Sequence, residues 1–458
     1  MLACHQRVFL KPWILSVFII LFASSSARAV PSFSTQTGQA CSACHVGSFG
    51  PQLTPYGRQF KLSGYTQSDG GNHGLPLALM MQSSFTSTQK SQNPPPVSGF
   101  GPNNNFSLDQ VSAFYAGAVT SSTGAFIQTT YDGINNVIHW DNSDVRYAHQ
   151  GTIQGIDYTA GITFNNNPTV QDLWNSTPAW GFPYAKSGLA PSPAASTLID
   201  GSLAQAVMGG GAYASFNDLL YVEADAYHGL SQNIRNGLGV VPVAGTDQYD
   251  GFMPYWRVAL EHTFGGEHYF EVGTYGISAD RFPGGDQTTG LKDHFLDNAV
   301  DVNYQWTADP DNLVSLHGTF IHENENLDAS YALGNSTNAS ERLDTFRADA
   351  SYSYQNTYTP SVQYFTTHGT SDATWWGTST GLASPNSQGY IVELGYVPFG
   401  KPDSPLPWVN GRLALQYVGY TEFDGTPSHA SDNNTIFLNL WLSLDPVAPL
   451  MSSSDQKP

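Results

Sequence analysis

Polar and apolar residues alternate along this chain in segments of about ten residues, from residue 75 almost to the end. In the stretch AVDVNYQW, residues 299–306, the side chains alternate between apolar and polar after the first alanine. Because successive side chains of a strand point to opposite faces, such a segment has one apolar and one polar face. Beyond the N-terminal segment no run of about 18 apolar residues occurs, which excludes a transmembrane helix. The sequence therefore predicts an all-β protein, a transmembrane antiparallel β-barrel with its apolar face toward lipid.

The length of the connections predicts how this barrel is oriented. Roughly sixteen strands fit the alternation. Tight turns (SSTG, ND, GGE, ADPD and NT) separate long segments near 88–104, 166–202, 229–253, 279–293, 324–342 and 368–387. Outer-membrane barrels have short periplasmic turns and long external loops. We therefore expect the long segments outside the cell and both termini in the periplasm, although the connection at 398–408 is longer than a periplasmic turn should be.

The chain divides into four expected parts. Residues 1–29 resemble an export signal with a basic start, an apolar core and the cleavage sequence ARA. Residues 30–74 form a cysteine-containing segment, residues 75–445 the barrel, and residues 446–458 a C-terminal tail. A secreted β-sandwich or solenoid would also alternate, but a sandwich of this length would need several domains, and no linkers are visible. The formal net charge of −20 argues against nucleic acid as a partner.

The pentad CSACH, residues 41–45, contains the only cysteines expected after removal of the signal. Two cysteines followed directly by histidine form the attachment signal of c-type haem, in which the thiols bond the vinyl groups and the histidine binds iron. We therefore expect one covalent haem c, attached through Cys41 and Cys44, with His45 as the proximal iron ligand. Three alternatives stay open: a disulfide, a thioredoxin-like pair without its usual βαβ context, and a zinc site that lacks two ligands.

The haem segment needs support from the barrel. Residues 30–74 are too few to form a hydrophobic core of their own. We expect them to sit as a plug in the periplasmic half of the lumen, with a short helix near Pro55–Leu62.

Here the sequence resembles the fused monohaem cytochrome–porins of the outer membrane of iron-oxidising bacteria. The resemblance rests on ACSACH followed by Pro51, Leu53, Pro55, Tyr56-Gly57-Arg58, Phe60-Lys61 and Gly64-Tyr65. It implies that electrons pass from an extracellular reductant, Fe(II), through one haem to a periplasmic electron carrier, a cytochrome or a cupredoxin. It implies haem attachment at Cys41, Cys44 and His45, and it identifies no residues that bind Fe(II).

Two other functions compete with electron transfer. A porin-like solute channel with a structural or sensory haem is the main alternative. A haem enzyme would need an acid–base residue beside an open iron position, and histidines such as His139 or His149 are more simply solvated. The sequence contains no hydrolytic or transferase motif, so an enzymatic role beyond Fe(II) oxidation is not indicated.

Charged residues on the polar strand faces are expected to hydrate the lumen and to form ion pairs with one another. A functional alternative is that some carboxylates attract ferrous ions, because hard oxygen ligands suit such cations. The carboxylates are Glu223, Asp225, Glu261, Asp301 and Glu393, and the arginines are Arg257, Arg347 and Arg412.

The second axial ligand of the iron is predicted from the first strand. Alternation in LPLALMMQSSFT places Met80 in the lumen and Met81 toward lipid. A thioether ligand raises the potential of a haem relative to two histidines, which suits an acceptor of electrons from ferrous iron. We favour Met80 as the distal candidate, with His73 as the second choice and another lumen residue or an open position as the third.

Overall fold

The computed structural model describes residues 31–71, 73–240, 246–309, 311–405 and 408–448. The expected export signal and most of the expected C-terminal tail lie outside these residues. None of the helices within the described ranges is long and apolar enough to cross a membrane.

The described residues form a single large sheet, a few short helices and four short helical turns. The helices are α2 (Pro31–Thr37), α3 (Cys41–Cys44), α4 (Pro55–Leu62), α5 (Gln232–Gly237) and α6 (Asp328–Leu333), and the turns are η1 (Val46–Ser48), η2 (Leu198–Ser202), η3 (Pro283–Gly285) and η4 (Ala430–Asn433). The strands are β1 (Leu77–Thr88), β2 (Asn105–Ala118), β3 (Thr123–Asp132), β4 (Val137–Ile153), β5 (Ile156–Asn165), β6 (Val207–Phe216), β7 (Leu220–Gly229), β8 (Gln248–Asp250), β9 (Phe252–Phe264), β10 (His268–Phe282), β11 (Asp293–Asp309), β12 (Asn312–Asn326), β13 (Ser340–Tyr354), β14 (Tyr358–Gly369), β15 (Ser387–Tyr396), β16 (Val409–Glu422) and β17 (Thr435–Leu444).

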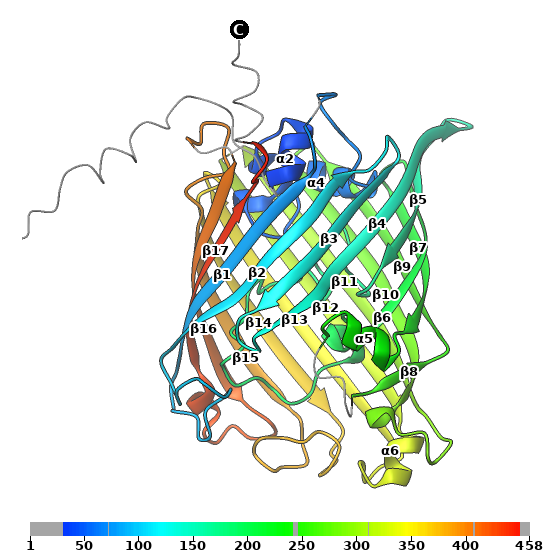
Figure 1. Ribbon diagram of the computed structural model, residues 1–458, viewed down its shortest axis with the longest axis vertical. Helices are drawn as coiled ribbons and strands as arrows, with labels where there is room; N and C mark the ends of the chain where they lie inside the picture. Colours follow the sequence, from blue (N-terminus) through cyan, green and yellow to red (C-terminus); the bar gives the residue numbers. More distant parts are fainter. Residues whose placement is uncertain (1–30, 72, 241–245, 310, 406–407, 449–458) are drawn as a thin grey trace, which may run out of the picture.

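The sheet closes on itself as an antiparallel barrel (Figure 1). The first strand, β1, pairs with both β2 and the last strand, β17, so no edge is left open. Strands β8 and β9 both pair with β10, on either side of Gly251, where a φ of +70° interrupts the strand. These two strands share one position, so the 17 strands fill sixteen positions around the barrel. The predicted fold class and strand number are confirmed.

The two ends of the barrel differ in their connections, and we call them the turn end and the loop end. At the turn end, 154–155 join β4 and β5 and 217–219 join β6 and β7; at the loop end, 89–104 join β1 and β2. The N-terminal helices and the end of β17 lie at the turn end (Figure 1). The connection from β15 to β16 is also at the turn end, and its Gly400 oxygen accepts a hydrogen bond from the Ser42 nitrogen (3.1 Å). This unusually long connection therefore contacts the N-terminal segment.

The outer face of the barrel is apolar, as the alternation predicts. On β11, Val300 and Val302 are 54% and 36% exposed, whereas Asp301 between them is 3% exposed. Aromatic side chains on the outer face ring the turn end, an arrangement typical of the girdles of outer-membrane barrels. They are Phe216, Phe264, Trp306, Tyr354, Tyr358 and Tyr396.

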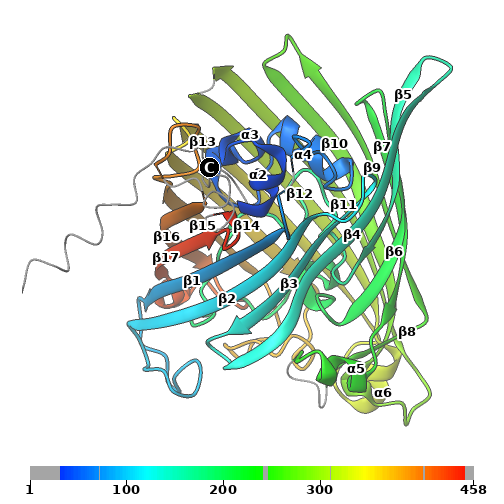
Figure 2. The ribbon, with the colours of Figure 1, turned by 45° about the horizontal axis from the view of Figure 1, so that its top comes forward.

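Helices α2, α3 and α4 lie inside the barrel at the turn end and form a plug (Figure 2). Thr54 caps α4 by accepting a hydrogen bond from the Gly57 nitrogen (3.2 Å), and Pro55 opens the helix, where its missing N–H costs nothing. Beyond the C-terminus of α4, the Tyr65 hydroxyl donates to Asp144 on β4 (2.7 Å). The same carboxylate pairs with Arg146 (2.7 Å), so the plug is tied to the barrel wall by a buried charged network.

The segment 166–206, between β5 and β6, folds into the lumen instead of extending outward. Trp174, Leu189 and Leu203 in this inward segment are each 1% exposed. The Lys61 ammonium of α4 donates to the main-chain oxygens of Val170 (2.7 Å) and Asp172 (2.6 Å), so the segment packs directly on the plug. Our prediction that this segment extends outside as an external loop was wrong, because these apolar side chains are more stable when buried in the lumen.

Candidate cofactor site in the barrel lumen

The CSACH pentad forms one turn of helix followed by an extended residue. The His45 nitrogen donates to the Cys41 oxygen (2.9 Å), and the Cys44 oxygen accepts from the Thr54 nitrogen (2.9 Å). This second bond brings α4 so close that a Cβ on Gly57 would lie 2.2 Å from the Cys44 oxygen. Only glycine allows this approach, so the YGR sequence after the pentad fixes the position of the cysteines.

Both cysteines are free thiols, which is not the disulfide that the sequence left open. Burial raises the pKa of the Cys44 thiol to about 12 and that of the Cys41 thiol well above its ordinary value. Burial also lowers the pKa of His45 to about 4, so its imidazole is neutral at neutral pH. Neutral imidazole is the form that binds metal ions. The buried His45 Nδ1 has no hydrogen-bond partner among the described residues.

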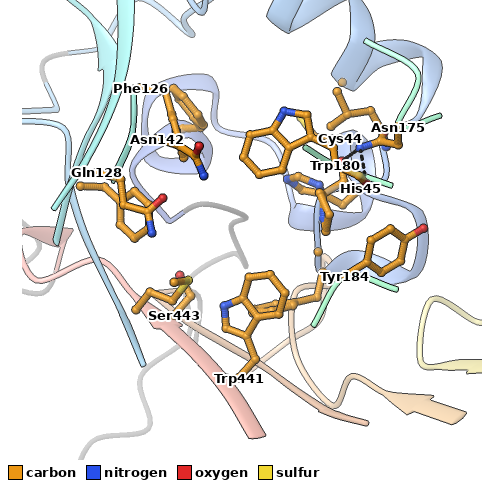
Figure 3. Close-up of a pocket in the computed structure, with 18 of the residues that line it drawn as sticks. Cys44, His45, Phe126, Gln128, Asn142, Asn175, Trp180, Tyr184, Trp441 and Ser443 are labelled. Atoms are coloured by element: carbon orange, nitrogen blue, oxygen red, sulfur yellow. Dashed lines mark hydrogen bonds between the residues drawn. The ribbon is translucent and has the colours of Figure 1, made fainter. Parts of the chain in front are cut away.

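A cavity of about 430 Å³ opens beside this pentad. Figure 3 shows Cys44, His45 and Tyr184 on one side of the space, Gln128 and Asn142 on the opposite side, and the indoles of Trp180 and Trp441 between them at the two remaining sides. The indoles come from the inward segment and from β17, and the two amides from β3 and β4. The plug, the inward segment and the barrel wall therefore all contribute to one site.

The residues of this cavity fit a c-type haem. Cys44 and the imidazole of His45, which has an unpartnered buried nitrogen, line one side, and the buried Cys41 thiol belongs to the same helical turn. Aromatic faces are available to pack on a flat ring, and the volume is in the range of cofactor pockets. The residues fit a zinc site less well, because the described part of the chain contains no group of three or more His, Cys, Asp or Glu side chains that could hold a metal ion.

The two distal candidates are in different places. Met80 is 9% exposed and lines the cavity, while its neighbour Met81 is partly buried and does not. The His73 ring is outside the cavity lining and pairs with Asp69 (2.5 Å). Met80 is thus the candidate with access to the cavity, and its role as iron ligand stays a prediction. His139 and His149 do not line the cavity either.

Four of the five lumen carboxylates are buried rather than hydrated and Glu261 is half-buried, which corrects our expectation. Asp301 pairs with Arg257 (2.7 Å) and Glu393 with Arg412, whereas Arg347 pairs with Asp200 (2.5 Å) of the inward segment. Three carboxylates form no ion pair with the described residues. They are Glu223, Asp225 and Glu261, of which Glu261 accepts a hydrogen bond from Tyr269.

Sequence reasoning missed the aromatic residues of the cavity. Trp180 and Tyr184 lie in the segment predicted to be external. The aromatic content of this segment is unusual for a solvated loop and could have indicated that it is buried. Trp441 lies on β17 in IFLNLWLSL, where Phe437 and Trp441 interrupt the otherwise polar lumen face. Apolar residues on both faces of a strand indicate that something apolar packs inside the barrel.

No protein-family model matches this chain, and no curated protein is similar to it. Solved structures of outer-membrane channels are similar at low identity. OmpF of Salmonella typhi, solved with daunomycin, has a TM-score of 0.47 at 12% identity over 80% of this chain and 97% of its own. The channel DcaP of Acinetobacter baumannii has a TM-score of 0.43 at 11% identity over 80% and 96%. These likenesses are too distant to transfer a function, and the fold described above rests on the strand pairing itself.

Proposed function

We propose that this protein is an outer-membrane electron-transfer protein that holds one c-type haem inside its barrel. The observation that carries the proposal is the CSACH pentad at the wall of a lumen cavity that Met80 also lines. A closed barrel with an apolar outer face and an aromatic girdle is suited to an outer membrane. The turn end is assigned to the periplasm, because short turns face that side in such barrels.

The proposal assigns a role to the pentad, to Met80 and to the two tryptophans of the cavity. Cys41 and Cys44 would hold the haem by thioether bonds, and His45 and Met80 would be the residues that bind its iron. The haem, when bound, accepts and releases one electron at its iron. The protein excludes water with Trp180 and Trp441 and keeps His45 neutral through burial. No acid–base residue is required, because outer-sphere transfer moves only an electron.

The electron donor is proposed to be an extracellular reductant, Fe(II), as the resemblance to cytochrome–porins implies. The acceptor is a periplasmic carrier, a cytochrome or a cupredoxin, that reaches the plug from the turn end. The net reaction is Fe(II) to Fe(III) outside, with the electron leaving for the carrier. We propose no Fe(II)-binding residues.

A porin-like channel is the second candidate, and the sixteen-position barrel favours it, because solute channels share this architecture. Against free diffusion, the plug and the inward segment both lie in the lumen and are bonded to each other through Lys61. A channel of this kind would pass small solutes whether or not a cofactor is attached.

Two measurements on purified protein separate the candidates. Ferric protein in detergent is mixed with Fe(II) in a stopped-flow instrument and the haem bands are followed, with the Cys41→Ser, Cys44→Ser double variant as the haem-free control. Sugar-driven swelling of proteoliposomes is measured in parallel. Rapid haem reduction without swelling supports electron transfer. Swelling that is equal in the wild type and the double variant, without haem reduction by Fe(II), overturns it in favour of a channel.

A further inference from the structure

Lys186 is a cation with no partner inside the cavity. It belongs to the inward segment and lines the cavity. Its side chain is exposed, yet the surrounding protein lowers its pKa through burial, with the Arg347 charge adding to the effect and Asp200 opposing it. The two observations agree because the side chain is exposed to the cavity, which protein surrounds on several sides. Lys186 makes no ion pair or hydrogen bond with any of the described residues.

The charges around Lys186 do not neutralise it. Asp200 is already paired with Arg347 (2.5 Å). The one carboxylate of the described cavity lining is Asp141, which accepts hydrogen bonds from Thr130 (2.7 Å) and Gln205 (3.2 Å). The second lysine of the lining, Lys61, supplies no counter-charge: it donates to main-chain oxygens, and burial lowers its pKa to about 7. A partly desolvated charge without a counter-ion is unfavourable, so a ligand that brings an anion to Lys186 would be stabilised there.

Lys186 lies nearer the loop end of the lumen than the pentad does. The next residue, Ser187, bonds the Thr86 hydroxyl (2.6 Å) near the loop end of β1, whereas Tyr184, two residues before Lys186, donates to Gln52 of the N-terminal segment (3.0 Å). The thiols are held at the turn end, where Ser42 binds the β15–β16 connection. A ligand attached at the thiols and extending along the cavity would therefore approach Lys186 with its far edge.

We propose that Lys186 binds the propionate carboxylates of the haem and so orients the ring with its thioether edge toward the turn end. This inference rests on the proposed function. The two propionates of a haem project from the side of the ring away from the vinyl groups, and they are anionic at neutral pH. Ion pairing with an ammonium in a partly apolar cavity is stronger than in water. A cation beside the ring also favours the reduced iron, which carries one positive charge less, and thus raises the potential.

The test compares three lysine variants of the full-length protein. Lys186→Met removes the charge, Lys186→Arg keeps it, and Lys90→Met removes a charge from an exposed pair with Asp432 at the loop end (3.0 Å). Haem content is measured by pyridine haemochrome and the midpoint potential by optical redox titration at several pH values. We expect Lys186→Met to lower the potential, Lys186→Arg to stay near the wild type, and Lys90→Met to leave it unchanged.

The outcomes distinguish this inference from the proposed function. If Lys186→Met has full haem content and a wild-type midpoint potential, the role of Lys186 is overturned and the proposed function is not. If the midpoint potential drops equally in Lys186→Met and Lys186→Arg, the role of the lysine charge is overturned. Absence of haem from the wild-type protein overturns the proposed function and this inference with it. If Lys186→Met does not assemble, Lys186→Gln, which keeps a polar tip without the charge, takes its place with the same expected drop.

Discussion

Replacing Tyr65 with phenylalanine should loosen the plug without changing its packing. The ring is 5% exposed and stacks on Phe33 with centroids 5.4 Å apart, so phenylalanine keeps these contacts. The variant loses one hydrogen bond, from the hydroxyl to the buried Asp144 carboxylate (2.7 Å). A hydrogen bond to a charged group contributes about 1.5–3 kcal/mol. Since about 1.4 kcal/mol is a factor of ten in an equilibrium constant, plug opening should become roughly 10- to 150-fold more frequent.

Native-state hydrogen exchange measures this opening directly. The amides of Ser63 and Tyr65, which bond the oxygens of Gln59 (2.9 Å) and Phe60 (3.1 Å), should exchange faster in Tyr65→Phe by the same factor. The matched control is Tyr131→Phe, which removes a hydroxyl bond to Asn136 at the loop end. Unchanged exchange of the plug amides in Tyr65→Phe, or equal acceleration in the control, would refute the argument that this network holds the plug.

Three further predictions follow from the fold and the cavity. Gly57→Ala should lower haem content, because its Cβ would collide with the Cys44 oxygen, whereas Gly237→Ala, where no atom lies within 4 Å, should load normally in a haemochrome assay. Met80→Ala should change the axial-ligand spectrum and lower the midpoint potential, and Met81→Ala should do neither; the reverse pattern would contradict the assignment. Unheated protein should run faster than boiled protein on denaturing gels, since a closed ladder has no edge from which to unfold, and recovery in a detergent-free soluble fraction would contradict a membrane barrel.

Alternation was sufficient to predict the barrel, because a strand with one face in lipid must have an apolar side chain at every second residue. The same rule correctly placed Met80 inside and Met81 outside. It also indicated where short and long connections occur. The interruption at Gly251 was not visible, since a single glycine in an alternating segment leaves the pattern intact on either side.

The cavity could be predicted only in part. Cys41, Cys44 and His45 lie within five consecutive residues, so the local sequence was enough to identify them as candidate haem-binding residues. The opposite walls come from segments that are distant in the sequence, with Trp180 from the inward segment and Trp441 from the last strand. The direction in which a long connection folds depends on what it can bury, and loop length carries no information about that.

We propose that the barrel carries one haem bound covalently at the CSACH pentad. The most direct test is the haem stoichiometry of the purified mature protein, measured by pyridine haemochrome together with the mass of the intact chain. We predict one haem per chain, lost in the Cys41→Ser, Cys44→Ser double variant. A stoichiometry near zero in protein from a host that attaches haem c, or haem retained by the double variant, would contradict the claim.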